Sequence, residues 1–363
     1  MRILVLNWKD PDSADAGGAE LYVRRLVEQW SAGRHEVTLM TPRLRGAEST
    51  PAAGVARVRR GSRLTVFQHA RQLLRQEGRR FDRVLESVST RPFFAHELVG
   101  DRAVALYHQV ADDVWRHEYP MPVAWLGRHV VEPRWIRRMQ RARVVAVSPS
   151  TATDLARHGV EAVAIVPPGN DPPVNLEPRA APASPPRVAY VGRLVRTKRP
   201  GDAIEAFATI ATALPGAAMD VVGAGYLDAE LRAVAPAGVR FHGHVSEQTK
   251  EAILAAADLV LCPGTREGWG IVVMEAAAFG VPVIAYDIPG LRDAVVDGQT
   301  GVLTAPAPAA MAAAAIDLLA DPPAWGALAR GARQRALAHT WKRSADDLMT
   351  VLAGVQEAGA VTA

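Results

Sequence analysis

The chain has 363 residues, of which 49% are hydrophobic and 22% charged, and its formal net charge is +4. This length is comfortable for two domains, and this composition excludes a disordered chain. A single cysteine excludes an intramolecular disulfide framework, and no apolar run is long enough to cross a bilayer, so we expect a cytoplasmic protein.

Charge is unevenly distributed along the chain. The first 170 residues carry 26 Lys or Arg against 18 Asp or Glu, whereas the remainder carries 16 against 20. A basic first half and a mildly acidic second half fit two domains with different ligands. Because the basic residues lack interleaved aromatic residues that could stack on bases, we expect no nucleic-acid partner.

The first half of the chain alternates predicted strands with helix-like segments. The predicted strands cover residues 2–7, 36–40, 55–58, 81–86, 104–107, 144–147 and 163–166. This alternation predicts a parallel sheet with helices on both faces, whose ligands lie at the carboxyl ends of the strands. Gly17 and Gly18 begin the first helix and permit close backbone approach by a phosphate or sugar, with a plain tight turn as the alternative. His108 follows a strand directly, a position that favours a ligand role over a structural one.

Residues 122–143 form a basic stretch that contains Trp125 and Trp135. It combines eight apolar residues with six arginines. Such a stretch can lie on an anionic membrane surface, or it can be an ordinary helix packed on the sheet with an arginine-rich outer face. Both interpretations remain open from the residues alone.

The second half begins after a proline-rich segment. Six prolines in residues 171–186 cannot continue a sheet or a helix, so this segment is predicted to be a linker. Strands are predicted at 187–192, 258–262 and 281–286, and two more end in the glycine turns of 219–225 and 239–245. Helices are predicted at 271–279, 309–319 and 324–338, with a last helix after Trp341.

Two cations follow the strand at 187–192. Arg193 can bind two oxygens of a pyrophosphate with its guanidinium group, and Lys198 supplies a point charge. Arg196 is the less favoured ligand, and simple surface charge is the alternative interpretation.

The turn at residues 263–270 joins a buried strand to a helix, and it is framed by Glu267 and Glu275. Backbone N–H groups at a helix start attract negative or hydroxyl-rich ligands. Seven residues separate the two acids, too many for them to share a proton, so they suit the two ends of an elongated ligand. Glu275 lies in an apolar helix and needs a partner, for which a ligand hydroxyl is one candidate. The alternative makes Glu267 a helix cap and Glu275 a solvated residue.

The Glu267–Glu275 spacing resembles the Glu-x7-Glu signature of retaining glycosyltransferases of the GT-B fold, family four, also called glycosyl transferases group 1. The Arg193–Lys198 spacing, the Gly-Gly-x-Glu turn at Gly17 and the histidine at 108 also match that family. The resemblance implies an α/β protein with two Rossmann-like domains facing a central cleft. The acceptor-binding domain would cover 1–170, with a C-terminal helix at 342–358 packing back on it, and the nucleotide-sugar domain would cover 187–341.

The same resemblance implies roles for individual residues. Those implied to be catalytic are His108, Glu267, Arg193 and Lys198. Those implied to bind the donor are Gly17, Gly18, Val245, Gly268, Trp269, Gly270 and Glu275. Asn170 departs from the family pattern, which often has a small apolar residue there.

The activity implied is transfer of a hexose-type sugar from a nucleoside-diphosphate sugar to a hydroxyl acceptor, with retention and without a cofactor or metal ion. The acceptor could be a glycolipid, a polysaccharide precursor or a natural product, and a lipid-linked acceptor would fit peripheral contact with an anionic membrane. The alternatives are another GT-B enzyme, such as a pseudo-glycosyltransferase or a sugar-nucleotide epimerase, and a catalytically silent nucleotide-sugar binding protein.

Overall fold

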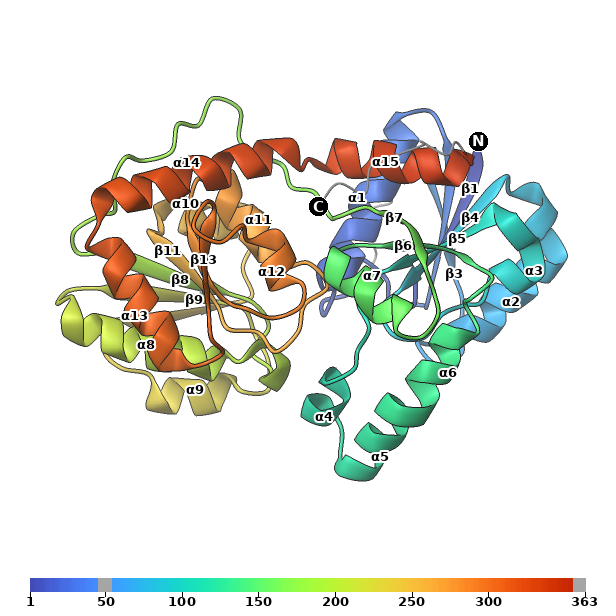
Figure 1. Cartoon of the computed structure of the whole chain (residues 1–363). Helices are drawn as coiled ribbons and strands as arrows, with labels where there is room; N and C mark the ends of the chain where they lie inside the picture. The colour runs from blue at the N-terminus through green and yellow to red at the C-terminus, as the bar shows by residue number, and fades with distance from the viewer. Residues whose placement is uncertain (45–53, 355–363) are drawn as a thin grey trace. The chain divides into compact units, whose positions relative to one another are not determined.

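The computed structural model describes residues 1–44 and 54–354. The chain divides into two compact units, one made of residues 1–112, 125–169 and those from Trp341 onward, the other of residues 113–124 and 170–340. Each unit contains one parallel sheet covered by helices (Figure 1). The α/β class with two Rossmann-like domains is therefore confirmed.

The first unit is built on a seven-stranded sheet in the order β3-β2-β1-β4-β5-β6-β7, and every neighbouring pair is parallel. The strands are β1 (Arg2–Leu6), β2 (Glu36–Thr41), β3 (Val55–Arg59), β4 (Arg83–Val88), β5 (Ala103–Tyr107), β6 (Arg143–Ala146) and β7 (Ala162–Ile165). Strand order reverses at β1 and β4, so the loops after these two strands leave the sheet at a position where α/β proteins commonly bind ligands.

Helices cover both faces of this sheet. The helices and 3-10 or π turns of this unit are α1 (Gly18–Ala32), α2 (Val66–Glu77), η1 (Gly78–Arg80), α3 (His96–Val99), η2 (Gly100–Arg102), η3 (Gly127–Val131), α6 (Glu132–Arg137), α7 (Pro149–Ala156) and α15 (Trp341–Ala353). Residues 121–124 of α5 (Met121–Leu126) belong to the second unit. Apolar side chains of α2 pack on β1 and β4, forming one part of the core. On the other side, α15 packs on α1, where the Trp30 indole donates a hydrogen bond of 3.0 Å to the Ala345 carbonyl. The helix predicted at 342–358 thus begins at Trp341, and residues 355–358 lie outside the described residues.

The second unit is built on a six-stranded parallel sheet in the order β10-β9-β8-β11-β12-β13. The strands are β8 (Arg187–Val191), β9 (Ala218–Val222), β10 (Val239–Gly243), β11 (Leu259–Cys262), β12 (Val283–Tyr286) and β13 (Gly301–Thr304). The central strands β11 and β12 are buried along their whole length, as a sheet covered on both faces requires.

Two layers of helices enclose the second sheet. The helices and one 3-10 turn of this unit are α4 (Val114–Glu118), η4 (Arg196–Lys198), α8 (Pro200–Ala213), α9 (Asp228–Val234), α10 (Glu247–Ala256), α11 (Ile271–Ala278), α12 (Leu291–Ala294), α13 (Pro308–Leu319) and α14 (Pro322–Ala338). One layer contains α8, α9 and α13, and the other contains α10, α11 and α14 (Figure 1). Parallel strands place all their carboxyl ends at one edge, so the turns that open η4, α10 and α11 leave the sheet on the same side.

The proline-rich segment 171–186 lies within the second unit. The buried carboxylate of Asp258 accepts hydrogen bonds of 2.8 Å from both the Arg179 guanidinium group and the Ala183 amide. Asn170, the residue that departs from the family pattern, donates its side-chain amide to the Ala336 and His339 carbonyls at 3.0 and 2.6 Å. The side-chain amide of Asn170 therefore fixes the position of the chain where it enters this unit. No helix within the described ranges is long and apolar enough to span a bilayer.

Candidate functional site

The turn between β11 and α11 has the backbone geometry of an anion-binding site. Gly270 caps α11 with a φ of +92°, and a Cβ there would lie 2.8 Å from Leu291 Cδ2. Glycine adopts this conformation without strain, whereas any other residue would be strained and would displace the Leu291 side chain. The N–H groups of Gly268, Trp269 and Gly270 have no hydrogen-bond acceptor among the described residues. They are available to an external ligand at the positive end of α11.

Lys198 and Glu267 form an ion pair, although 69 residues separate them. A backbone hydrogen bond of 2.9 Å from the Thr265 N–H to the Thr197 carbonyl holds the two loops together. Exposed fractions of 26% for the Lys198 side chain and 19% for that of Glu267 leave both accessible from solvent. The structure thus brings together the first acid and one of the two predicted cations.

Arg193 is exposed, and its guanidinium group makes no hydrogen bond or ion pair with a described residue. Its backbone is fixed by Tyr190, whose buried hydroxyl donates to the Arg193 carbonyl at 3.2 Å and lies 3.4 Å from the Lys198 carbonyl. One tyrosine therefore holds both ends of the loop that carries the two cations. This role was not predicted, because Tyr190 lies in a strand and has the pattern of an ordinary core residue.

Glu275 has a protein partner that the sequence analysis missed. Lys250 in α10 places its ammonium group 2.8 Å from Glu275 Oε1 and 2.8 Å from Glu247 Oε2. Burial raises the pKa of Glu275, and the Lys250 charge partly opposes that rise. Burial also tends to lower the pKa of Lys250, but the two acids hold it above its usual value. The need for a partner inside an apolar helix was thus correctly recognised, but the partner is a lysine.

The remaining donor-binding candidates of this unit offer backbone groups. Val245 lies half-buried between β10 and α10, next to the Ser246 cap of α10. Trp269 is 5% exposed, and its ring lies 5.9 Å from the imidazole of His339. Because its side chain faces the interior, Trp269 can reach a ligand only through its main chain.

Gly17 and Gly18 open α1 in the first unit, as predicted. The Gly17 N–H donates a hydrogen bond of 2.8 Å to Glu20 Oε2, and Glu20 is buried. Glu20 of the Gly-Gly-x-Glu turn therefore caps the helix. Lys9 lies beside it, with its ammonium group 3.9 Å from the same carboxylate oxygen.

His108 directly follows β5 and is 8% exposed. Its Nε2 lies 2.9 Å from Ser87 Oγ, and the ring of Tyr22 meets its imidazole edge-on with centroids 5.8 Å apart. Burial lowers the pKa of His108 to about 4, so the imidazole is neutral at neutral pH. Since Tyr22 belongs to α1, the histidine and the glycine turn lie in adjoining parts of the same unit.

A buried glutamate fixes the loop after His108. Glu132 of α6 accepts hydrogen bonds of 2.7 Å from the Ala111 N–H and 3.0 Å from the Asp112 N–H. Arg128 pairs with Asp112 at 2.7 Å. These contacts were not predicted, because Glu132 reads as one acid in a basic segment.

The basic stretch 122–143 divides into two parts that behave differently. Ile136 and Met139 are buried in the core of the first unit, so the second part is an ordinary packed helix. In α5, by contrast, Val123 and Leu126 are 49% exposed and Trp125 is 56% exposed. Each of the two open interpretations therefore fits one part of the stretch.

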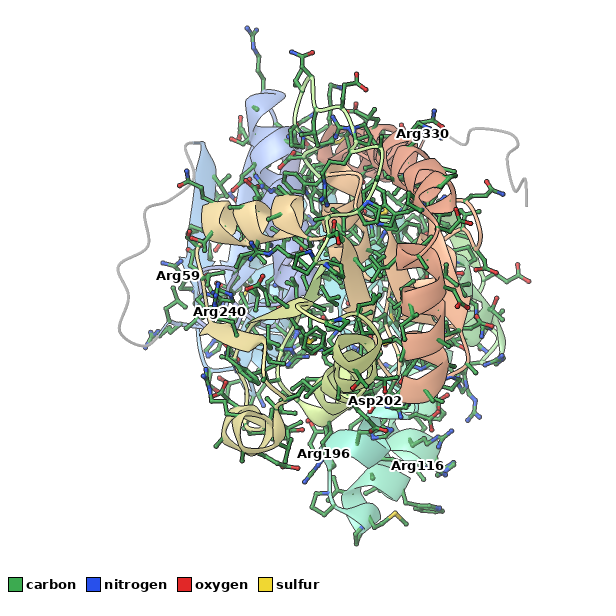
Figure 2. The ribbon with its side chains drawn as sticks, turned by 90° about the vertical axis from the view of Figure 1, so that its left-hand side faces the viewer. Arg59, Arg116, Arg196, Asp202, Arg240 and Arg330 are labelled. Carbon is green, nitrogen blue, oxygen red and sulfur yellow. The ribbon has the colours of Figure 1, made fainter. Side chains whose placement is uncertain are left out.

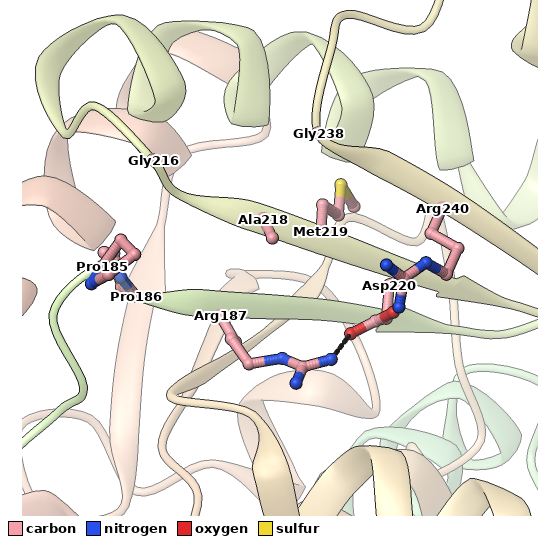
Figure 3. A pocket seen from close by; sticks show the side chains of 9 residues that line it. All are labelled: Pro185, Pro186, Arg187, Gly216, Ala218, Met219, Asp220, Gly238 and Arg240. Carbon is pink, nitrogen blue, oxygen red and sulfur yellow. Dashed lines mark hydrogen bonds and ion pairs between the residues drawn. The ribbon is translucent and has the colours of Figure 1, made fainter.

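A separate cavity of about 300 Å³ lies at the amino ends of β8, β9 and β10 (Figure 3). Its lining includes Arg187, Arg240 and Asp220, with Arg187 bonded to Asp220 at 2.9 Å. None of the predicted site residues lines it.

The described residues also contain no cluster of three or more His, Cys, Asp or Glu side chains that could hold a metal ion.

Comparison with protein families identifies the chain. Residues 174–356 match the family model described as Glycosyl transferases group 1, and residues 16–173 match Glycosyltransferase Family 4. The chain belongs to the glycosyl transferases group 1 family. It is a nucleotide-sugar glycosyltransferase of the GT-B type, as the Glu-x7-Glu spacing predicted.

Two named relatives are similar to this glycosyltransferase in sequence. A glycogen synthase of Mycobacterium tuberculosis is 29% identical over 92% of this chain and 90% of its own length. A GDP-mannose-dependent alpha-mannosyltransferase of Mycolicibacterium smegmatis is 33% identical over 59% of this chain and 58% of its own length.

Solved structures share the fold at low sequence identity. A sucrose-phosphate synthase of Thermosynechococcus elongatus has a TM-score of 0.77 at 22% identity and covers 98% of this chain and 99% of its own. HepE of Anabaena, in complex with UDP and glucose, has a TM-score of 0.73 at 18% identity and covers 98% and 100%. These similarities confirm the GT-B fold.

Proposed function

We propose that this glycosyltransferase moves a hexose-type sugar from a nucleoside-diphosphate sugar to a hydroxyl acceptor, such as a glycolipid, a polysaccharide precursor or a natural product. The observation that carries the proposal is the convergence of Lys198, Glu267 and the unpaired amides before α11. The M. smegmatis relative is named for its use of GDP-mannose, and the HepE structure contains UDP and glucose. Both support a donor of this class.

In the proposed complex the diphosphate lies against Arg193, Lys198 and the N–H groups of residues 268–270. These positive groups offset the charge that develops on the leaving nucleoside diphosphate, so no metal ion is required. Glu267 orients Lys198 and the hydroxyls of the donor sugar. Glu275, held by Lys250, accepts hydrogen bonds from the ribose hydroxyls, and the backbone at Val245 contacts the base.

The proposed reaction retains configuration at the anomeric carbon. The bond from that carbon to the diphosphate oxygen breaks as the bond to the acceptor oxygen forms on the same face. The acceptor's proton passes to the departing phosphate, so no protein carboxylate needs to act as a nucleophile. His108, Gly17 and Gly18 of the first unit are assigned to the donor sugar and the acceptor on the family resemblance.

Donor binding tests this assignment. We expect Lys198→Ala, Arg193→Ala and Glu275→Gln each to weaken donor affinity about 10- to 100-fold, since each removes a charge-assisted hydrogen bond. Affinity is measured by titration calorimetry with the best binder among UDP-glucose, GDP-mannose and ADP-glucose. Arg330→Ala on the exposed side of α14 is the matched control (Figure 2). Near-normal affinity in all three variants would remove the assignment.

The reaction products distinguish sugar transfer from the alternative reactions. Transfer releases nucleoside diphosphate only when an acceptor is present, whereas an epimerase converts the donor without releasing it. NMR of the product gives the anomeric configuration, and an unchanged rate in excess EDTA is expected if no metal ion takes part. Inversion, or a rate abolished by EDTA and restored by Mg²⁺, would contradict the proposed mechanism.

We further propose that the protein works at the inner face of the cytoplasmic membrane, held there peripherally through α5. Its exposed apolar side chains are followed, further along the chain, by the exposed arginines Arg134, Arg137 and Arg141. Apolar side chains can enter the lipid boundary while the arginines meet anionic headgroups. A lipid-linked acceptor would be presented at that surface.

A further inference from the structure

A short segment from the first half of the sequence belongs to the second unit. Residues 113–124 lie between β5 and β6 in sequence, yet they are part of the unit that carries Lys198. The segment contains α4, which contacts η4, the turn that ends at Lys198. The family motifs account for neither the segment nor this contact.

Glu118, the last residue of α4, makes the specific contacts. Its Oε1 accepts a hydrogen bond of 2.8 Å from Thr197 Oγ1 and one of 3.4 Å from the Thr197 N–H. Its Oε2 accepts a hydrogen bond of 3.2 Å from the Tyr226 hydroxyl. Tyr226 in turn accepts a hydrogen bond of 2.9 Å from the Arg196 N–H. The Glu118 carboxylate is thus connected to two residues of η4, directly to Thr197 and through Tyr226 to Arg196.

Thr197 connects Glu118 to the loop that carries Glu267. It is only 5% exposed, and its carbonyl accepts the hydrogen bond from Thr265 that joins η4 to the loop of Glu267. Its N–H and hydroxyl face Glu118, whereas its carbonyl faces Thr265. A shift of Glu118 would therefore displace the backbone of Thr197. This backbone precedes Lys198 directly and is hydrogen-bonded to the loop that carries Glu267.

We propose that Glu118 is a positioning residue for donor binding, which acts by fixing η4 so that the Lys198 ammonium group meets the donor diphosphate. This inference rests on the proposed function of Lys198. Glu118 is exposed, and its hydrogen bonds go to Thr197 and Tyr226 rather than to Lys198 or the other residues assigned to the diphosphate. Its effect therefore passes through Thr197 and Tyr226.

A positioning role and a simple charge effect predict changes of opposite sign. Removing a negative charge near a diphosphate site would strengthen anion binding, because it removes repulsion. Removing a positioning contact would weaken it. For Glu118→Ala we expect about three- to tenfold weaker donor affinity, the loss that corresponds to one or two ordinary hydrogen bonds. Glu118→Gln keeps an acceptor for Thr197 and should restore most of the affinity.

The test measures donor affinity by titration calorimetry on the full chain, with the nucleotide-sugar chosen above. The variants are Glu118→Ala, Glu118→Gln and Tyr226→Phe, with Glu161→Ala, an exposed glutamate of the other unit, as the control. Each is combined with Lys198→Ala in a double-mutant cycle. The proposal predicts that Glu118→Ala loses its effect once Lys198 is absent, because it acts through that lysine.

The outcomes separate this inference from the proposed function. If Lys198→Ala weakens binding but Glu118→Ala leaves it unchanged or tightens it, the positioning role is wrong and the donor site stands. Additive losses in the double variant would likewise overturn the role, since Glu118 would then act independently of Lys198. If Lys198→Ala itself has no effect, the donor-site assignment fails, and the role of Glu118 fails with it.

Discussion

At the scale of single residues, the buried imidazole of His108 makes the stability of the fold depend on pH. Its imidazole is neutral in the fold, where burial lowers its pKa to about 4, whereas in the unfolded chain it titrates near 6.5. Below pH 6.5 the unfolded chain therefore takes up a proton that the folded chain does not, and the free energy of unfolding falls until about pH 4. The size of this fall is about 3 kcal/mol for the histidine alone.

We predict that His108→Gln removes this dependence. The difference in unfolding free energy between the wild type and the variant, measured by urea titration at pH 7 and pH 4.5, should change by about 2–3 kcal/mol in the variant's favour at low pH. The comparison needs the variant because Glu86 acts in the opposite direction. Burial raises the pKa of Glu86 to about 7, so this group alone makes the fold more stable as the pH falls. A difference independent of pH would show that His108 is not held neutral.

Lys250 supports the buried charge of Glu275. Exposed fractions of 13% and 19% place both side chains largely inside the protein. We predict that Lys250→Met costs least stability at low pH, because burial raises the pKa of Glu275 and favours its protonated form there. The cost should rise to about 2 kcal/mol by pH 8, where the fold must bury an unpaired carboxylate.

The double variant Lys250→Met with Glu275→Gln is the matched control, since it removes the charge as well as its partner. It should recover most of the stability at pH 8. A cost of Lys250→Met that does not change with pH, measured by urea titration, would contradict the pairing. Lys342→Met on the surface of α15 controls for the loss of an exposed lysine.

The site residues that the sequence predicted are those whose type and spacing carry chemistry. Glu267 and Glu275 are spaced along one turn and helix, and Arg193 and Lys198 share one loop, so their neighbourhood follows from short-range geometry. The contacts of Lys250, Tyr190 and Glu118 join segments 25, 8 and 79 residues apart. Even the nearest of these contacts depends on how a loop folds back on its strand, which residue types do not specify.

At the scale of elements, α5 stands out by its exposed apolar surface. Met121 is 70% exposed, and Trp125 is 56% exposed. Burying such a side chain in a lipid boundary yields about 1.5–3 kcal/mol when burial is complete. This gain is large enough to decide whether the protein binds a membrane.

We predict that the protein co-sediments with vesicles containing anionic phosphatidylglycerol, and that the binding weakens with added salt. The double variant Trp125→Ser with Leu126→Ser should bind at least fivefold less tightly. Each substitution removes an apolar side chain, 56% exposed for Trp125 and 49% exposed for Leu126, that would otherwise enter the lipid. Leu337→Ser is the control, since Leu337 is 53% exposed on α14. Absence of vesicle binding in the wild type, or equal binding by the double variant, would contradict a membrane role for α5.

Most elements follow from the pattern of apolar residues, and the exceptions have local causes. The strand predicted at 81–86 is β4, which runs from Arg83 to Val88, so Ser87 lies within the strand. The polar side chain of Ser87 suggested that the strand ends before it, but Ser87 is buried and its hydroxyl is hydrogen-bonded to His108. The edge strand β13 was not predicted, since its four residues begin with a glycine and carry no long apolar run.

At the scale of the whole molecule, the alternation of strands and helices predicted two parallel sheets, and the structure contains them. What the sequence did not indicate is the exchange of residues 113–124, which leave one unit and join the other. A short helix such as α4 has too little apolar surface to reveal where it docks. Its position depends on a few polar contacts, among them those of Glu118.

The central claim is that a nucleoside diphosphate is bound by the cationic turn of the second unit. A crystal structure of the protein soaked with the diphosphate of its preferred donor tests this most directly. We predict that the phosphate oxygens lie within hydrogen-bond distance of Lys198, Arg193 and the N–H groups before α11. Diphosphate found instead in the cavity of Arg187 and Arg240, at the opposite edge of the sheet, would contradict the account.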